Sequence, residues 1–267
     1  MEIKNGTKAL LAVSYGTAYS GPQSDITAVE TSLRSAFPDH SFYRAWTSSV
    51  LRKRLEKEGE HILSVEGALE CMASEGVKEV VVQPTHMLYG EEYRRTEETV
   101  RSYAGRFTRL SVGAPLLNDE KDVARLTGIL EKEYTIQEGE LLALMGHGSA
   151  NMSLPVYELM QKQFILDGYK QVCIGTVEFD PGIEPVLARI RREKPKRVHL
   201  VPLLVSVGGH VIKDMAGDGE DSWKNQILRE GTEVECHMTG LGEVEAVREM
   251  YIRHAECARA ITEDVSK

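Results

Sequence analysis

Short, uninterrupted apolar runs alternate along the chain with longer segments whose apolar residues recur every three or four positions. The runs are typical of strands buried on both faces of a parallel sheet, and the longer segments of amphipathic helices. The predicted strands cover residues 8–15, 41–47, 78–83, 108–112, 141–146, 171–177, 197–204 and 232–238. The predicted helices cover residues 24–36, 61–75, 91–105, 119–134, 153–166, 181–192, 221–229 and 243–263. Such strict alternation indicates an α/β protein with parallel sheets and right-handed crossovers.

The two halves of this pattern resemble each other. The strand that contains residues 10–13 matches the strand that contains residues 141–144, and each runs into a turn of small residues. Residues 82–84 match residues 200–202 in the same way. The polar segment 135–140 is the best boundary between the halves.

We therefore expect two similar α/β halves, residues 1–137 and 138–267. Each is predicted to be a four-stranded parallel sheet flanked by helices, with a cleft between the halves. Domain interfaces are common places for ligand sites, so the polar loops of both halves are candidates for function.

Composition narrows the classes of function. The 267 residues are 42% hydrophobic and 27% charged, with a net charge of -9, which argues against a general nucleic-acid binder. No apolar run approaches the roughly 20 residues of a membrane span, and the first run is too short for a secretion signal. The 4 cysteines are scattered without a Cys-x-x-Cys pair, as expected for free thiols in a reducing compartment. We expect a cytoplasmic protein with no nucleic-acid or membrane partner.

Three polar side chains follow three strands of the second half. His147 lies in the turn Gly-His-Gly-Ser after the first of these strands, Glu178 follows the second, and His210 ends a glycine-rich loop after the third. Ligands bind parallel sheets just outside the carboxyl ends of the strands, where these side chains could converge. Two imidazoles and a carboxylate suit Co²⁺, Ni²⁺, Fe²⁺ or Zn²⁺, and three protein ligands leave coordination positions open. The structural alternative is that each histidine bonds a backbone carbonyl and Glu178 lies on a solvated loop.

Other histidines are weaker candidates. His86 lies in a loop that matches the loop before His210, so we keep it as a candidate. His199 and His237 lie within predicted strands and are expected to be packed in the fold.

Most sequence motifs of other enzyme classes are absent. The chain has no phosphate-binding glycine loop and no Gly-x-Ser-x-Gly nucleophile motif, so Ser149 is expected to cap a helix rather than to attack a substrate. Arg52, Lys53 and Arg54 form a basic run that is commonly a solvated helix face. Close to a cleft, the same run could bind carboxylates.

Several segments together resemble one family. They are VSYGT, QPTHMLYGEEY, LMGHGS, the Val-Glu pair at 177–178 and VPLLVSVGGHVIKDMAGDGEDSWK. The chain is similar along essentially its whole length to the anaerobic cobalt chelatases, the sirohydrochlorin cobaltochelatases of cobalamin synthesis. These belong to the class II chelatases, which also include protohaem ferrochelatase. The resemblance implies two α/β domains that flank a tetrapyrrole cleft. It also implies insertion of Co²⁺ into sirohydrochlorin, or its reduced precursor precorrin-2, without ATP or an organic cofactor.

The resemblance also assigns roles by position. The family's two metal-site histidines fall on His147 and His210, its carboxylate on Glu178, and the glutamate of its GDEY motif on Glu92, within GEEY here. We expect the first three to hold Co²⁺, a histidine to accept a pyrrole proton, and Glu92 to orient the macrocycle or relay protons. The residues expected to contact the polycarboxylate substrate are Ser14, Tyr15, Arg52, Arg54 and His86.

The ligand set does not select the metal, because the affinity of such a site rises from Co²⁺ to Ni²⁺ to Cu²⁺ whatever its biological metal. An iron chelatase that makes sirohaem is the alternative enzyme. A tetrapyrrole or metal carrier that binds without turnover is the alternative of a different class. The sequence leaves open whether the chain forms a homo-oligomer.

Overall fold

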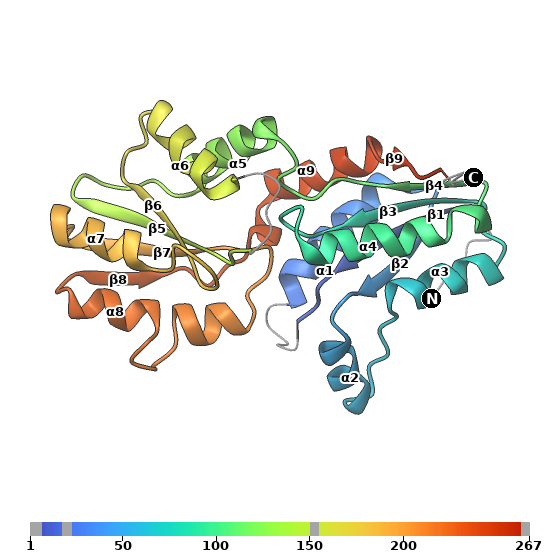
Figure 1. Cartoon of the computed structure of the whole chain (residues 1–267), viewed down its shortest axis with the longest axis horizontal. Helices are drawn as coiled ribbons and strands as arrows, with labels where there is room; N and C mark the ends of the chain where they lie inside the picture. Colours follow the sequence, from blue (N-terminus) through green and yellow to red (C-terminus); the bar gives the residue numbers. More distant parts are fainter. Residues whose placement is uncertain (1–6, 18–22, 150–154, 263–267) are drawn as a thin grey trace. The chain divides into compact units, whose positions relative to one another are not determined.

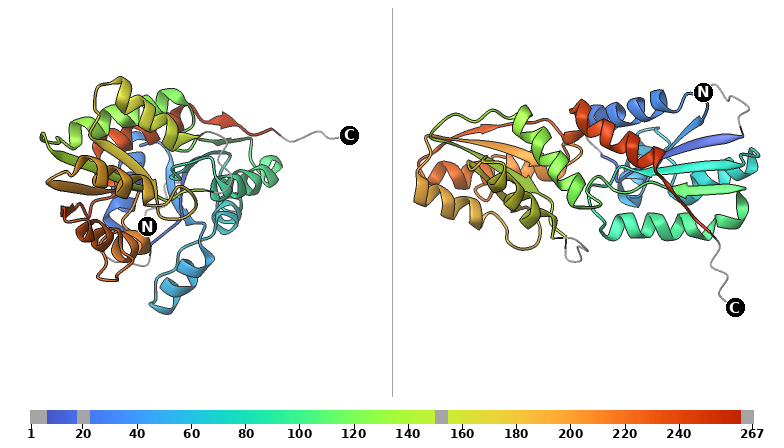
Figure 2. Two further views of the ribbon diagram at one scale, coloured as in Figure 1. Left: turned by 60° about the vertical axis from the view of Figure 1, so that its left-hand side comes forward. Right: turned by 90° about the horizontal axis from the view of Figure 1, so that it is seen from above.

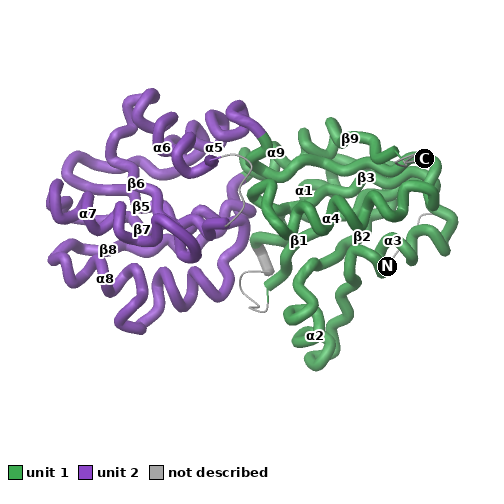
Figure 3. The backbone as a smooth tube through the Cα atoms, in the orientation of Figure 1, with its two compact units in different colours: residues 1–118, 245–267 green, residues 119–244 purple. Residues whose placement is uncertain are grey.

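The strands form where the sequence has uninterrupted apolar runs. The computed structural model describes residues 7–17, 23–149 and 155–262, and all eight predicted strands are present in two sheets. Strands β1 (Lys8–Ser14) and β5 (Glu140–Gly146) lie inside their sheets and are buried almost throughout, which explains their lack of polar alternation. The chain divides into two compact units, unit 1 (Met1–Asn118, Glu245–Lys267) and unit 2 (Asp119–Val244), shown in Figure 3. Each unit is described by itself.

Unit 1 is a sheet with helices on both faces (Figure 1). Its strand order is β2-β1-β3-β4-β9 in the described part of the chain. Helices α3 and α4 share the apolar cluster on one face, and α1 packs against α9 on the other, as Figure 2 shows from above. The further elements of unit 1 are α1 (Gln23–Ala36), β2 (Ser41–Trp46), α2 (Ser49–Lys57), α3 (Val65–Ser74), β3 (Glu79–Pro84), α4 (Glu91–Ser102), η1 (Ala104–Arg106), β4 (Arg109–Val112), α9 (Glu245–Glu256) and β9 (Arg259–Ala260).

Unit 2 has the same layered arrangement. Its sheet has the order β6-β5-β7-β8, with α7, α8 and the π-helical turn η2 packed on one face and α5 and α6 on the other. The further elements of unit 2 are α5 (Glu120–Glu133), α6 (Val156–Leu166), β6 (Val172–Thr176), α7 (Glu184–Glu193), β7 (Arg197–Leu203), η2 (His210–Met215), α8 (Trp223–Arg229), β8 (Glu233–Cys236) and η3 (Leu241–Glu243).

The internal repeat is visible in the sheet topology. Strand β1 pairs in parallel with β2 and β3, and β5 pairs in parallel with β6 and β7. The order β2-β1-β3-β4 in unit 1 therefore corresponds to β6-β5-β7-β8 in unit 2. Helix α4 after β3 is the counterpart of η2 after β7, in agreement with the predicted match of residues 82–84 and 200–202.

The units do not divide where we expected, between residues 137 and 138. Helix α5 precedes that boundary but lies in unit 2, where it packs against α6. Helix α9 follows the boundary but lies in unit 1, where it packs against α1. The linear pattern shows that a helix has an apolar face, but it does not show which neighbours cover that face.

Two local elements of unit 1 differ from the prediction. Helix α2 is recognisable in the sequence only as a basic run, because Leu51 and Leu55 are its one buried or partly buried apolar pair at helical spacing. Helix α3 begins at Val65 rather than at residue 61, since Ser64 Oγ accepts a hydrogen bond from the Gly67 N–H at 3.0 Å. Ile62, predicted on that helix, instead packs in the small apolar cluster that contains Leu55.

The last predicted helix is too long. Helix α9 ends at Glu256, and the chain continues as β9, which pairs antiparallel with β4. The sheet of unit 1 is therefore five-stranded over its described residues and not wholly parallel. Residues 153–154 and 263, at the expected ends of two helices, lie outside the described residues. No described helix combines the length and apolar character needed to cross a membrane, and the four cysteines are free.

Candidate functional site

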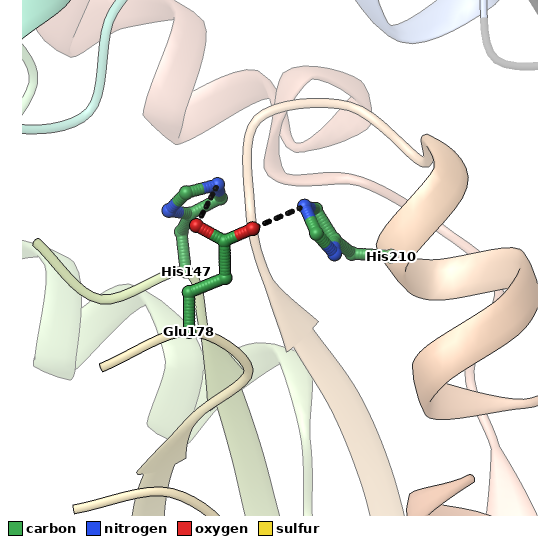
Figure 4. Close-up of side chains that lie close together, drawn as sticks. All are labelled: His147, Glu178 and His210. Carbon is green, nitrogen blue, oxygen red and sulfur yellow. Dashed lines mark ion pairs between the residues drawn. The ribbon is translucent and has the colours of Figure 1, made fainter. Parts of the chain in front are cut away.

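The topology of unit 2 brings together the three residues predicted at its strand ends. Strand β5 lies between β6 and β7, so His147, Glu178 and His210 leave the sheet from neighbouring strands at the same edge. We call these three residues the strand-end cluster. Figure 4 shows their side chains pointing toward one another.

Two backbone hydrogen bonds join the segments that follow β5 and β6 and fix the first two members. The N–H of Val177 donates to the carbonyl oxygen of Gly146 at 2.8 Å, and the N–H of Glu178 donates to that of His147 at 2.9 Å. Gly148 has a φ of +87°, and a Cβ there would overlap the carbonyl oxygen of Glu178. The close approach of these two segments therefore requires glycine at position 148.

The turn after Glu178 is held from within. Thr176 Oγ1 donates to the carbonyl oxygen of Phe179 at 2.9 Å and accepts from the N–H of Gly182 at 3.1 Å. Phe179 has a φ of +64°, a conformation that is costly for a residue with a side chain. The hydrogen bonds of Thr176 hold this turn in place, and with it the residue before Phe179, Glu178.

Hydrogen bonds also orient the two imidazole rings. His147 Nδ1 lies 3.0 Å from the carbonyl oxygen of Gly148, and His210 Nδ1 lies 2.7 Å from Asp214 Oδ2. Because both partners are acceptors, Nδ1 carries the proton in each ring, and Nε2 of the neutral ring has a free lone pair. Metal-binding histidines are commonly fixed by such a bond from the nitrogen that does not bind the metal.

The free nitrogens face the carboxylate. His147 Nε2 lies 4.0 Å from Glu178 Oε2, and His210 Nε2 lies 3.6 Å from Glu178 Oε1. The two rings are perpendicular, with centroids 5.1 Å apart. Ligand atoms of all three residues lie within 4.8 Å of one another, and the side chains of His147, Glu178 and His210 are 45%, 48% and 36% exposed. An ion bound here would have three protein ligands and open positions toward solvent.

Two residues of this site were not predicted from the sequence. Asp214 lies four residues after His210, a spacing visible in HVIKD that could have indicated a helical pair. Tyr157 is buried, and its hydroxyl accepts from the N–H of Gly148 at 3.1 Å. A Cβ at Gly146 would overlap the ring of Tyr157, so the turn and this ring are fitted to each other. Ser149 caps no described helix, since α6 begins at Val156 after Pro155.

The other predicted site residues all lie in unit 1, at the end of β1, in or beside α2 and around the start of α4. They are Ser14, Tyr15, Arg52, Arg54, His86 and Glu92.

The β1 residues differ in exposure. Ser14 is buried and its hydroxyl accepts from Thr85 Oγ1 at 2.9 Å, a structural role within unit 1. Tyr15 is 53% exposed and available for contact.

The two arginines are on α2. Arg54 Nε lies 3.6 Å from Glu58 Oε1, an exposed pair of little energetic weight. Arg52 Nε is covered and has no hydrogen-bond partner among the described residues.

His86 and Glu92 are in and after the loop that follows β3. Both ring nitrogens of His86 are covered and have no hydrogen-bond partner within the described ranges, and burial lowers the pKa of His86 to about 4. The ring is therefore neutral near pH 7. Glu92 is partly exposed, and its Oε1 lies 3.8 Å from Arg95 Nη1.

Comparisons of the sequence with a family model and with curated proteins agree on one family. The sequence model of the cobalt chelatase (CbiK) family matches residues 8–260. The sirohydrochlorin cobaltochelatase of Salmonella typhimurium is 33% identical over 250 residues, covering 92% of this chain and 94% of that protein. The sirohydrochlorin cobaltochelatase CbiKC of Nitratidesulfovibrio vulgaris is 29% identical over 262 residues, covering 96% and 92%.

A solved structure agrees in fold. SirB from Bacillus subtilis with Fe³⁺ matches with a TM-score of 0.61 over 93% of this chain and 94% of SirB. At 17% identity this likeness shows the chelatase-like α/β fold alone. The match of the family model along nearly the whole sequence confirms the resemblance seen in the motifs: the chain belongs to the cobalt chelatase (CbiK) family.

Proposed function

We propose that this protein inserts Co²⁺ into sirohydrochlorin or its reduced precursor precorrin-2. The observation that carries the proposal is the convergence of His147, Glu178 and His210, with both histidine Nε2 atoms directed at the carboxylate, in a member of the cobalt chelatase family. The names of two relatives, each a sirohydrochlorin cobaltochelatase matched over more than 90% of its length, support cobalt and sirohydrochlorin as the substrates.

The strand-end cluster supplies the metal-binding half of this chemistry. The Nε2 atoms of His147 and His210 and a carboxylate oxygen of Glu178 take the place of water ligands on the incoming ion. Three protein ligands leave the remaining positions to water and then to pyrrole nitrogens. The exposure of all three side chains lets the ion and the macrocycle reach each other.

Insertion also releases two protons, because each of two pyrrole N–H groups must lose its proton as the metal binds. An imidazole that is released from the metal can accept such a proton near pH 7, so one residue type can serve both steps. Metal–nitrogen bonds to the macrocycle replace those to the protein. From the family resemblance, we expect the reaction to need neither ATP nor an organic cofactor.

The contribution of unit 1 stays a prediction. We expect Glu92 to orient the macrocycle or relay protons, and the neutral ring of His86, Tyr15 and the α2 arginines to contact the substrate. A cytoplasmic setting and an absence of nucleic-acid partners are likewise expectations from the sequence, and homo-oligomer formation is left open.

The test is anaerobic. Purified protein is mixed with sirohydrochlorin and Co²⁺, and formation of the cobalt product is followed by visible absorbance. We expect many turnovers per protein molecule at a rate above that without protein. A spectral change that saturates at one equivalent would contradict the proposal and indicate a carrier. A higher kcat/KM with Fe²⁺ than with Co²⁺ would instead indicate an iron chelatase.

Replacing Asp214 by asparagine is expected to lower the insertion rate about 10-fold, because His210 Nδ1 loses its charged acceptor while Nε2 remains. The rate is measured against Co²⁺ concentration, since weaker orientation of His210 should raise the concentration needed for half-maximal rate. Asp218→Asn is the matched control: its carboxylate is fully exposed and pairs with Lys224 at 3.0 Å. Equal insertion rates in the two variants would show that Asp214 does not support His210 in the reaction.

A further inference from the structure

Unit 2 contains a second group of metal-ligating side chains, away from the strand-end cluster. His199 lies in β7, Glu235 is its register partner in β8, and His237 directly follows β8. Ligand atoms of these three residues lie within 4.8 Å of one another. We call them the β7–β8 cluster. The side chains of His199 and His237 are mostly covered, at 13% and 27% exposure, as expected from the sequence, while Glu235 is 50% exposed.

The separations between ligand atoms are close to those around a bound metal ion. His199 Nδ1 lies 3.2 Å from His237 Nε2 and 3.7 Å from Glu235 Oε2, and His237 Nε2 lies 4.0 Å from Glu235 Oε1. Around a tetrahedral ion with bonds of about 2.1 Å, neighbouring ligand atoms are roughly 3.4 Å apart. Only small side-chain rotations are needed to close this set on an ion.

A fourth residue sets the tautomer of His199. Its Nε2 lies 3.0 Å from Glu140 Oε2, and Glu140 is buried at the start of β5. A carboxylate oxygen accepts, so His199 Nε2 carries the proton of this hydrogen bond. The lone pair of neutral His199 is then on Nδ1, directed at the other two members of the cluster. Such a carboxylate–histidine pair is the usual support of a metal-binding imidazole.

The alternative is a chain of hydrogen bonds without metal, in which His237 Nε2–H donates to His199 Nδ1. In that arrangement the carboxylate of Glu235 faces a nitrogen lone pair at 3.7 Å with no proton between them. The guanidinium of Arg197, whose Nη1 lies 3.6 Å from Glu235 Oε2, offsets part of this charge, whereas a cation between the rings removes the contact and uses all three groups.

We propose that the β7–β8 cluster is a second cation site, which binds a borderline divalent ion such as Zn²⁺ or Co²⁺. Its ligands are His199 Nδ1, His237 Nε2 and a carboxylate oxygen of Glu235, with water at the exposed side. The ring of Tyr134, at the end of α5, contacts the His237 ring edge-on with centroids 5.2 Å apart and covers one side. The bound ion ties the edge strand β8 to β7.

This site is separate from the strand-end cluster. Leu142 is the β5 register partner of His199, and His147 lies five residues farther along. At about 3.3 Å per residue, the two sites are roughly 16 Å apart along the sheet. They can therefore hold different ions at the same time.

The test uses the full chain with the strand-end ligands removed. The double variant His147→Ala, His210→Ala is titrated with Zn²⁺ against a chromophoric chelator and with Co²⁺ by visible absorption, without tetrapyrrole. We expect one equivalent of Zn²⁺ to bind and to raise the temperature of unfolding by several degrees. Adding His237→Ala should weaken Zn²⁺ binding at least about 100-fold and abolish the thermal shift. Adding His61→Ala instead is the control, because that imidazole is 74% exposed and outside both clusters.

A milder variant guards against loss of the fold. Glu235→Gln keeps the size of an exposed side chain and should weaken Zn²⁺ binding about 10-fold with an unchanged unfolding temperature in the absence of metal. The proposal is wrong if the double variant binds no Zn²⁺ at about 100 µM, or if the His237→Ala variant binds it equally well. Since no tetrapyrrole is present, these outcomes do not depend on whether the protein inserts cobalt.

Discussion

Replacing His147 or His210 by alanine is expected to reduce the rate of Co²⁺ insertion at least about 100-fold, with little change in the free energy of unfolding. Each imidazole offers an Nε2 lone pair, and the hydrogen bond of its own Nδ1 fixes the direction of that lone pair. The strand-end cluster has no further described side chain that could replace a lost imidazole. Both side chains are partly exposed, so their truncation leaves no closed cavity in the core.

The measurement pairs initial rates with urea unfolding followed by circular dichroism. His61→Ala is the matched control, since it removes an imidazole that is 74% exposed and lies outside the cluster. An insertion rate within about twofold of the wild type in either the His147 or the His210 variant would exclude that residue from the reaction. A variant that also unfolds more easily would be uninformative about chemistry. For that case His147→Asn and His210→Asn keep a polar donor near the Nδ1 position and remove the Nε2 lone pair.

Replacing Gly148 by alanine is expected to reduce both stability and activity. The new Cβ would overlap the carbonyl oxygen of Glu178, and the φ of +87° is unfavourable for any residue with a side chain. We expect a loss of about 2–4 kcal/mol in the free energy of unfolding. The insertion rate should fall at least about 10-fold, because the turn that carries Glu178 must move. Urea unfolding and the anaerobic insertion assay measure the two effects.

Gly128→Ala provides the control for this substitution. Gly128 lies in α5, and a methyl group added there would meet no atom of another described segment within 4 Å. Helix propensity predicts a gain of about 0.5–1 kcal/mol in the free energy of unfolding. If Gly148→Ala behaved like Gly128→Ala in both assays, the close packing of Gly148 against the Glu178 backbone would contribute to neither stability nor activity.

The positions of the strands could be predicted because burial on both faces requires continuous apolar runs. Strand β5 is buried at every residue, and its sequence has no polar interruption after Glu140. Helix α2 is not predicted, because a single apolar pair, Leu51 and Leu55, in a basic segment is too short a periodic signal. Strand β9 has only two residues, which pair antiparallel with β4, and no pattern of that length identifies a strand.

The strand-end cluster could be predicted because the carboxyl ends of neighbouring parallel strands meet at one edge. Its support by Asp214 is not predicted: the i,i+4 spacing to His210 is visible, but the glycines on both sides of the π-helical turn η2 indicate a loop. The β7–β8 cluster was also missed. His199 and Glu235 meet only through the register of β7 with β8, and register is set by packing rather than by spacing along the chain.

The interleaved order of the two units has a consequence for biosynthesis. Unit 2 is one continuous insertion between two pieces of unit 1, so a ribosome completes all of unit 2 before it makes α9. Until then, Thr85 lacks the hydrogen bond that its carbonyl accepts from Tyr251 Oη at 2.8 Å, and α1 lacks the helix that packs against it. Since domains generally fold as units during synthesis, we expect the strand-end cluster of unit 2 to form while unit 1 of the nascent chain is still incomplete.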